Sequence, residues 1–236
     1  MLIFPTIQIN DGMCVSLERG DTERPVVWHV DPVSKAKEFS HAGASWMHVT
    51  DFDAISGSDK NRDLVVKIIR QAGIPVQYGG GIRSALHVDE WVDLGAGRIV
   101  IGTLAVVNPN LVKEIAKLHP DQIVIALDIW QGKVMIHGWK ESGPIEPEDF
   151  IKAYYRVPLA GIIITDIDAN IDDLKSTLEQ LTYLAGISSS PVIASGVVRK
   201  VSDIKRLSKI PNVEGAIVGT GLYNKTFGIE DILNVV

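Results

Sequence analysis

The chain has 236 residues, of which 46% are hydrophobic and 22% charged, so it can fill the core of one large globular domain or two small ones. Its formal net charge is −6 and no Lys/Arg cluster stands out, which argues against nucleic acid as a partner. No apolar run reaches the ~18 residues of a membrane span, and the N-terminus lacks the basic region of a signal peptide. The single cysteine, Cys14, fits a reducing compartment. We therefore expect a cytoplasmic protein without membrane contact.

Short apolar runs alternate with amphipathic segments along the whole chain. The runs predict strands at residues 2–9, 46–49, 76–78, 98–101, 122–127, 161–164, 192–194 and 215–218. The amphipathic segments predict helices at residues 32–42, 61–72, 84–94, 109–118, 147–155, 171–184, 201–207 and 228–236. Several runs are apolar throughout, as in strands buried on both faces of a parallel sheet. This alternation predicts a (β/α)₈ barrel, with a doubly wound open sheet as the alternative.

An internal repeat decides between these two folds. Four motifs of the first half recur in the second at nearly constant offsets of 120, 115, 116 and 117 residues: Gln8 and Gly12 at Asp128 and Gly132, Thr50–Ala54 at Thr165–Ala169, Pro75–Arg83 at Pro191–Arg199, and Ile101–Thr103 at Val218–Thr220. Two four-strand halves of this kind close into a barrel, whereas an open sheet gives no reason for the match. We therefore predict a single domain, residues 1–236, made of half-barrels at about 1–120 and 121–236.

The repeat places two glycine-rich anion cradles on opposite sides of the barrel mouth, where strands of this fold present their ligand-binding ends. Backbone N–H groups, a hydroxyl and a helix N-terminus suit a phosphate in each. One cradle is predicted from Gly80, Gly81, Arg83, Gly102 and Thr103, and the other from Ser195, Gly196, Gly219 and Thr220. The pair predicts a small molecule with a phosphate at each end. The alternative is that these glycines only relieve crowding at strand–helix turns.

Three residues are candidates for the centre of the mouth. Asp128 ends a very apolar run, which favours a catalytic carboxyl group over a structural cap of the next loop. Thr165 offers a hydroxyl that could hold an intermediate, or it only hydrogen-bonds at a strand end. Trp139, in a loop after Asp128, could stack on a planar ring, with core packing as the alternative.

Two further aspartates, Asp51 and Asp166, follow threonines at matched places, which favours helix caps or supporting groups over direct chemistry. The six histidines are scattered without metal-ligand spacing, so we predict no metal site.

Taken together, these motifs resemble the ProFAR isomerases of histidine biosynthesis, whose full name is phosphoribosylformimino-5-aminoimidazole carboxamide ribotide isomerase. The resemblance covers the whole chain and rests on Asp11-Gly12, Gly79–Arg83, Ile101–Thr103, Leu127-Asp128, Gly138-Trp139, Thr165-Asp166, Ala194–Gly196 and Val218–Thr220. The related cyclase subunit of imidazole glycerol phosphate synthase shares the repeat, but Leu222-Tyr223 and the Gly-Trp pair look more like the isomerase. The resemblance implies an Amadori rearrangement of an aminoaldose to an aminoketose, a substrate with two phosphates and no cofactor. It also implies an aspartate base at the end of strand one and an aspartate acid at the end of strand five, which Asp128 matches.

The chain departs from this family at three places. Gln8 stands where the family has its strand-one base, and a carboxamide cannot accept a proton at neutral pH. The family's Asp-Gly-Thr after strand six is matched by Asn170-Ile171-Asp172, and its Ser-Gly-Gly after strand seven by Ser195-Gly196-Val197. Three interpretations stay open: an isomerase, a catalytically silent or repurposed barrel that binds phosphorylated ligands, and an enzyme acting on another phosphorylated substrate through Asp128, alone or with Asp51. In each case we expect a monomer.

Overall fold

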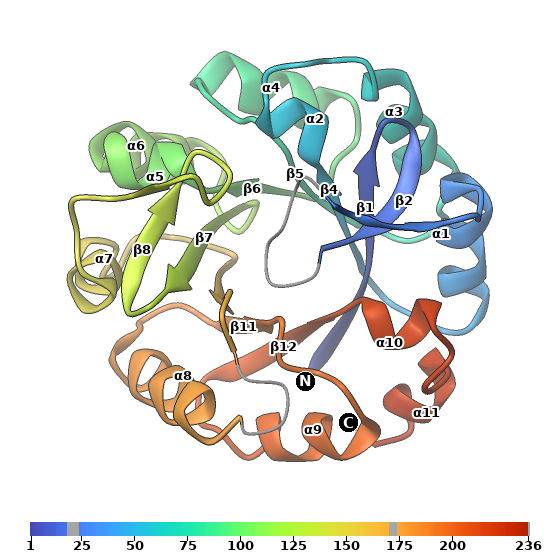
Figure 1. Cartoon of the computed structure of the whole chain (residues 1–236). Coiled ribbons are helices and arrows are strands. Elements are labelled where there is room, and N and C mark those ends of the chain that lie inside the picture. Colours follow the sequence, from blue (N-terminus) through green and yellow to red (C-terminus); the bar gives the residue numbers. More distant parts are fainter. Residues whose placement is uncertain (18–23, 170–173, 236) are drawn as a thin grey trace.

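The computed structural model describes residues 1–17, 24–169 and 174–235. Within them, eight parallel strands form a closed barrel: β1 (Leu2–Asn10), β4 (Met47–Asp51), β5 (Val76–Gly79), β6 (Arg98–Ile101), β7 (Ile123–Trp130), β10 (Gly161–Asp166), β11 (Val192–Ser195) and β12 (Val213–Val218). The strands pair in this order, and pairing of β12 with β1 closes the ring. Figure 1 looks along the barrel, with the helices around the strands. The predicted (β/α)₈ barrel is confirmed.

Helices follow the barrel strands in turn. The longer ones are α1 (Pro32–His41), α3 (Arg62–Gln71), α4 (Ala85–Asp93), α6 (Pro109–Leu118), α7 (Pro147–Ala153), α8 (Lys175–Ile187) and α9 (Val201–Leu207). Shorter ones are α2 (Phe52–Ile55), α5 (Thr103–Val107), α10 (Thr220–Tyr223) and α11 (Ile229–Leu233). Seven of the eight predicted helices coincide with helices of the structure within a few residues, and the eighth, at 171–184, is α8, which the structure describes from Lys175.

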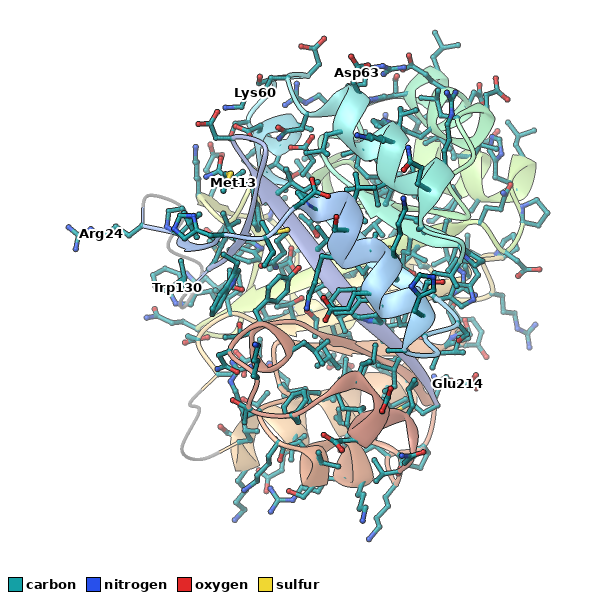
Figure 2. All side chains as sticks on the ribbon, turned by 90° about the vertical axis from the view of Figure 1, so that its right-hand side faces the viewer. Met13, Arg24, Lys60, Asp63, Trp130 and Glu214 are labelled. Atoms are coloured by element: carbon teal, nitrogen blue, oxygen red, sulfur yellow. The ribbon has the colours of Figure 1, made fainter. Side chains whose placement is uncertain are left out.

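Two hairpins at the barrel mouth were not predicted. Strand β2 (Met13–Ser16) folds back on β1 and continues to β3 (Val26–Trp28), and β8 (Lys133–Ile136) folds back on β7 and continues to β9 (Glu141–Ser142). The prediction that strand five ends at Leu127 is therefore wrong, because pairing with β8 extends β7 to Trp130. Figure 2 shows Met13 and Trp130, both on these hairpins, at one end of the barrel, with Glu214 of β12 toward the other.

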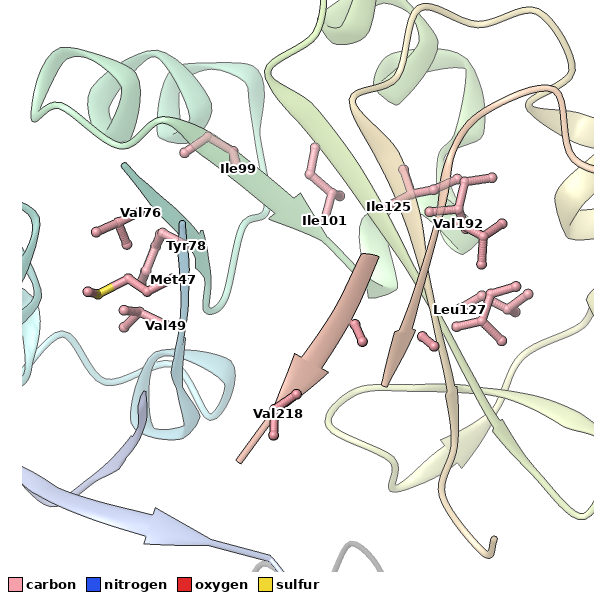
Figure 3. Close-up of a cluster of buried hydrophobic side chains, with 14 of the residues drawn as sticks. Met47, Val49, Val76, Tyr78, Ile99, Ile101, Ile125, Leu127, Val192 and Val218 are labelled. Atoms are coloured by element: carbon pink, nitrogen blue, oxygen red, sulfur yellow. The ribbon is translucent and has the colours of Figure 1, made fainter. Parts of the chain in front are cut away.

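The hydrophobic core has two layers. The larger lies between the strands and the helices and includes the labelled residues of Figure 3, among them Val49, Tyr78, Ile101 and Leu127. The smaller fills the barrel interior with Phe4, Val100, Val124, Ala160, Ile163, Ile193 and Ile217. Because successive side chains of a strand face opposite sides, these two layers account for the apolar runs of the sequence.

The structural elements repeat at the offsets seen in the sequence. β2 and β8 are 120 residues apart, and β5 and β11 are 116 apart, in each case at both ends of the strand. The hairpin turns match as well, since Asp11 and Gln131 both have positive φ, 50° and 49°, and a glycine follows each. These correspondences support the division of the chain into half-barrels near residue 120.

Candidate functional site

Two matched rows of side chains cross the mouth of the barrel. In the first half, Thr50 is the register partner of both Gln8 and Gly79. In the second half, Thr165 is the partner of both Asp128 and Ser195. Gln8, Thr50, Asp128, Thr165 and Ser195 are all partly exposed, as expected of groups that line an opening. The structure therefore brings Asp128 and Thr165 side by side, with Gln8 in the equivalent position of the other half.

Asp128 lies within β7 rather than at its end, so it is not a cap of the following loop. Burial raises the pKa of this carboxyl group, while hydrogen bonds from the Trp139 and Thr165 side chains partly oppose the rise. A raised pKa keeps a larger fraction of the group protonated near neutral pH, as a general acid requires. The arrangement suits a proton donor held by two neighbouring hydrogen-bond donors.

Trp139 reaches Asp128 from an unusual turn. His137, Gly138 and Trp139 have successive positive φ angles of 53°, 67° and 68°, a left-handed conformation that costs about 1–2 kcal/mol for each non-glycine residue. The turn is held at the start of α5, because the His137 N–H donates to Thr103 Oγ1 at 2.8 Å. It also lies against α2, since a Cβ on Gly138 would come within 2.9 Å of Ile55 Cγ2. Strain of this kind is typical of segments that place a functional side chain.

The first predicted cradle combines crowded and open glycines. A Cβ on Gly81, whose φ is +60°, would lie 2.1 Å from the Ala54 carbonyl oxygen, and one on Gly80 would lie 2.7 Å from Tyr78 Oη. For Gly102, in contrast, no heavy atom of the described residues lies within 4 Å of a Cβ position. The glycines at 80 and 81 thus relieve crowding, as the alternative reading held, whereas the space beside Gly102 is free for a ligand.

Two other members of this cradle already have protein partners. The Arg83 guanidinium donates to the Ile55 carbonyl oxygen at 3.1 Å, so it holds the end of α2 rather than pointing freely into the cradle. Thr103 Oγ1 accepts from His137, which leaves its own O–H proton available to a ligand.

The second predicted cradle has a different backbone. Its left-handed residue is Gly196, at φ +79°. The repeat offset of 116 pairs Gly196 with Gly80, whereas the left-handed glycine of the first cradle is the next residue, Gly81. Val197, which matches Gly81, is 3% exposed and packs in the outer core layer, so its side chain does not project into the mouth. Gly219 is crowded, because a Cβ there would come within 2.9 Å of Thr6 Cγ2. Ser195 and Gly219 are partly exposed and Thr220 is exposed. Asn170, Ile171 and Asp172 lie outside the described residues.

The expected supporting role of Asp51 is confirmed. Its carboxylate caps α2 by accepting from the Asp53 and Ala54 N–H groups at 3.0 and 3.1 Å, and it accepts from Asn61 Nδ2 at 2.8 Å. Asp166 matches it, accepting a short hydrogen bond from Thr177, which stands 116 residues after Asn61. Both aspartates therefore hold the loops of the mouth in place.

Two polar residues behind the first row, His48 and Gln77, were not predicted as part of the site. His48 Nε2 lies 2.8 Å from Thr50 Oγ1, and Gln77 Nε2 lies 3.1 Å from His48 Nδ1. His48 is 7% and Gln77 0% exposed, and burial lowers the pKa of His48 to about 4. The sequence pattern that could have revealed them is the alternation of His48 and Thr50 with Met47 and Val49, which indicates a strand with one polar face.

Neither a metal centre nor a membrane segment was found in the described residues. No group of three or more His, Cys, Asp or Glu side chains there is arranged to hold a metal ion. No helix among them is long and apolar enough to cross a membrane.

Comparison with known proteins assigns the family. A family model described as histidine biosynthesis protein matches residues 2–228. A protein of Ruegeria sp. (strain TM1040), named 1-(5-phosphoribosyl)-5-((5-phosphoribosylamino)methylideneamino) imidazole-4-carboxamide isomerase 1, is 51% identical over 233 residues, 99% of this chain and 94% of the relative. The correspondingly named isomerase 2 of Ruegeria pomeroyi is 50% identical, covering 100% and 95%. The isomerase of Caulobacter sp. (strain K31) is 39% identical, covering 100% and 99%. With these matches along its whole length, the chain belongs to the histidine biosynthesis protein family.

Proposed function

We propose that this protein is an aldose–ketose isomerase that converts ProFAR by an Amadori rearrangement, the reaction for which its relatives are named. The observation that carries the proposal is Asp128, a carboxyl group of raised pKa held by Thr165 and Trp139 between two glycine cradles. The cradles follow β5–β6 and β11–β12, which stand opposite each other in the ring of strands. The relatives' names describe a molecule with two phosphoribosyl groups, which matches a site with two anion cradles.

In the proposed reaction Asp128 donates a proton to the ring oxygen of the aminoaldose, and the sugar opens to an iminium. A proton then leaves the carbon next to the iminium, and the enaminol that forms becomes the aminoketose. Thr165 holds the open chain by its hydroxyl, and Trp139 stacks on the planar imidazole carboxamide. Gly102 and Thr103 bind one phosphate, Gly196 and Gly219 the other, and no cofactor takes part.

A second candidate function is a barrel that binds phosphorylated ligands without turning them over. Gln8 is the observation that favours it, because this carboxamide occupies the position that matches Asp128 and cannot accept the substrate's proton. Direct assay of ProFAR conversion separates the two functions, and complementation of a histidine auxotroph tests the first in a cell. Phosphate-induced thermal stabilisation without turnover would support the binder instead.

We also propose that the protein acts as a cytoplasmic monomer. Asp128 and both cradles belong to one chain, so a second copy is not needed to complete the site. Light scattering after gel filtration should give a mass near 25.7 kDa, and a mass near twice that value would contradict the monomer.

A further inference from the structure

One row of side chains in the barrel interior is polar in the first half of the chain and apolar in the second. Side chains on adjacent strands of the first half form a register row toward the interior: Thr6, His48, Gln77 and Arg98. Their counterparts at the repeat offsets are Ala126, Ile163, Ile193 and Gly215. A buried polar group is costly unless hydrogen-bonded, so a polar row within an otherwise apolar interior needs an explanation beyond packing.

Part of this row is hydrogen-bonded into a chain that runs to the mouth. Gln77 lies against His48 Nδ1, and His48 Nε2 lies against Thr50 Oγ1. Gln77 Oε1 has no partner among the described residues although it is fully buried. Rotating the amide by 180° would present this oxygen to His48 Nδ1, so Gln77 can support the imidazole as an acceptor or as a donor. Such a partner stabilises both the neutral and the protonated ring.

Thr50 stands beside the position that lacks a carboxylate. It is the register partner of Gln8, just as Thr165 is the partner of Asp128 in the other half. Behind Thr165 the strand carries Ile163, which cannot take a proton, whereas behind Thr50 it carries His48. The half-barrel without the mouth carboxylate is thus the one with an imidazole behind its threonine.

We propose that Thr50 and His48 together accept the substrate proton on the side of the mouth where Gln8 replaces a carboxylate. This inference rests on the proposed isomerase function. Thr50 is then a catalytic residue, and His48 is the positioning residue that acts through it.

The step balances without any further reactant. The C–H bond next to the iminium breaks, and its electron pair forms the C=C bond of the enaminol. The proton moves to Thr50 Oγ1 as the hydroxyl proton of Thr50 passes to His48 Nε2. The imidazolium then returns one proton through Thr50 to the former iminium carbon. The enaminol hydroxyl passes its proton to the carboxylate of Asp128, which gave up its own proton at ring opening, as the ketone forms.

The basicity of His48 fits this role. Burial lowers its pKa to about 4, so the ring is neutral at pH 7 and has a free lone pair. A model aspartate has a pKa of about 3.9, so the relay ends in a base about as strong as the carboxylate absent from position 8.

The test compares Thr50→Val with Thr6→Val, which removes a hydroxyl from the same interior row but outside the relay. Thr6 Oγ1 has no hydrogen-bond partner among the described residues, so its loss should leave kcat unchanged. Thr50→Val should lower kcat by about 10²-fold or more, the usual contribution of a positioned base, with little change in KM. It should also slow the loss of deuterium from the labelled substrate carbon. Thr50→Ser, which keeps the hydroxyl, should restore most of kcat.

A second background separates chemistry from structure. In Gln8→Asp the carboxylate can take the proton directly, so adding Thr50→Val should change kcat less than threefold. Equal losses in both backgrounds would show that Thr50 only supports the mouth and would overturn the relay. If wild type turns over and Thr50→Val is as fast, the relay is wrong while the isomerase function stands. If wild type shows no turnover although phosphate stabilises it against heat, both the relay and the isomerase function are wrong.

Discussion

Replacing Gly102 by Ala should separate ligand binding from stability, because a methyl group there meets no atom of the described part of the chain. Within residues 1–17, 24–169 and 174–235 no heavy atom lies within 4 Å of the Cβ position, so the free energy of unfolding should change by less than about 0.5 kcal/mol. The methyl group would instead occupy the space in front of the cradle amides. Loss of one hydrogen bond to a charged phosphate costs about 1.5–3 kcal/mol, which weakens phosphate binding roughly 10- to 150-fold.

Gly81→Ala is the matched variant in the same cradle. Its Cβ would lie 2.1 Å from the Ala54 carbonyl oxygen at a φ of +60°. A left-handed alanine costs about 1–2 kcal/mol and overpacking about 1–3 kcal/mol, so the free energy of unfolding should fall by about 2–5 kcal/mol. For a chain of this length that lowers Tm by roughly 4–20 °C.

Calorimetric titration with inorganic phosphate and thermal melts of both variants provide the measurements. Phosphate affinity of Gly102→Ala equal to wild type would refute the first cradle. A Tm of Gly81→Ala equal to wild type would refute the steric reasoning.

Four further outcomes are expected. Asp128→Asn should lower kcat by about 10²–10⁴-fold in the ProFAR assay. Because burial raises the pKa of Asp128, ionisation of this group opposes folding, so the variant should have a higher Tm than wild type at pH 7, and the difference in Tm should shrink as the pH falls. A lower Tm of the variant at pH 7 would contradict this. Gln8→Asp should raise kcat, by roughly tenfold if direct proton transfer replaces the relay, and an unchanged kcat would point to another acceptor. Burial lowers the pKa of His48 to about 4, against 6.5 for a free histidine, so this group's contribution to the free energy of unfolding is fully present above pH 6.5 and falls by up to about 3 kcal/mol toward pH 4. Urea unfolding should show this loss in wild type and much less of it in His48→Gln. Crystals grown with sulfate should hold the ion near Gly102 more fully than near Gly219, where Thr6 crowds the backbone, and the reverse order would count against the open first cradle.

The hairpin of β7 and β8 shows why the predicted end of strand five was wrong. The apolar run stops at Leu127, and a reading of hydrophobicity alone ends the strand there. Main-chain pairing with β8 carries β7 on to Trp130, because hydrogen bonds between strands do not depend on which side chains follow. Asp128 therefore lies within a rigid ladder, which holds its carboxyl group more firmly than a loop would.

The sequence by itself determined the fold and predicted the location of the proposed site. Apolar runs of strand length alternating with amphipathic segments require a parallel sheet covered by helices, and the repeat at 115–120 residues requires two similar halves. Strand ends in such a barrel meet at one mouth, so Asp128, Thr165 and the glycine motifs were placed together from their positions alone.

Only the tertiary structure decided which side chains touch. Register pairing joins Thr50 to Gln8 and His48 to Gln77, contacts between residues up to 42 positions apart that no local pattern specifies. The crowding at Gly81 and the open space at Gly102 were decided in the same way. Ala54 crowds Gly81, whereas no described residue lies within 4 Å of a Cβ on Gly102. Hydrophobic periodicity records how each segment faces the core, whereas contacts across the barrel depend on strand register and closure, which form only when distant segments pair.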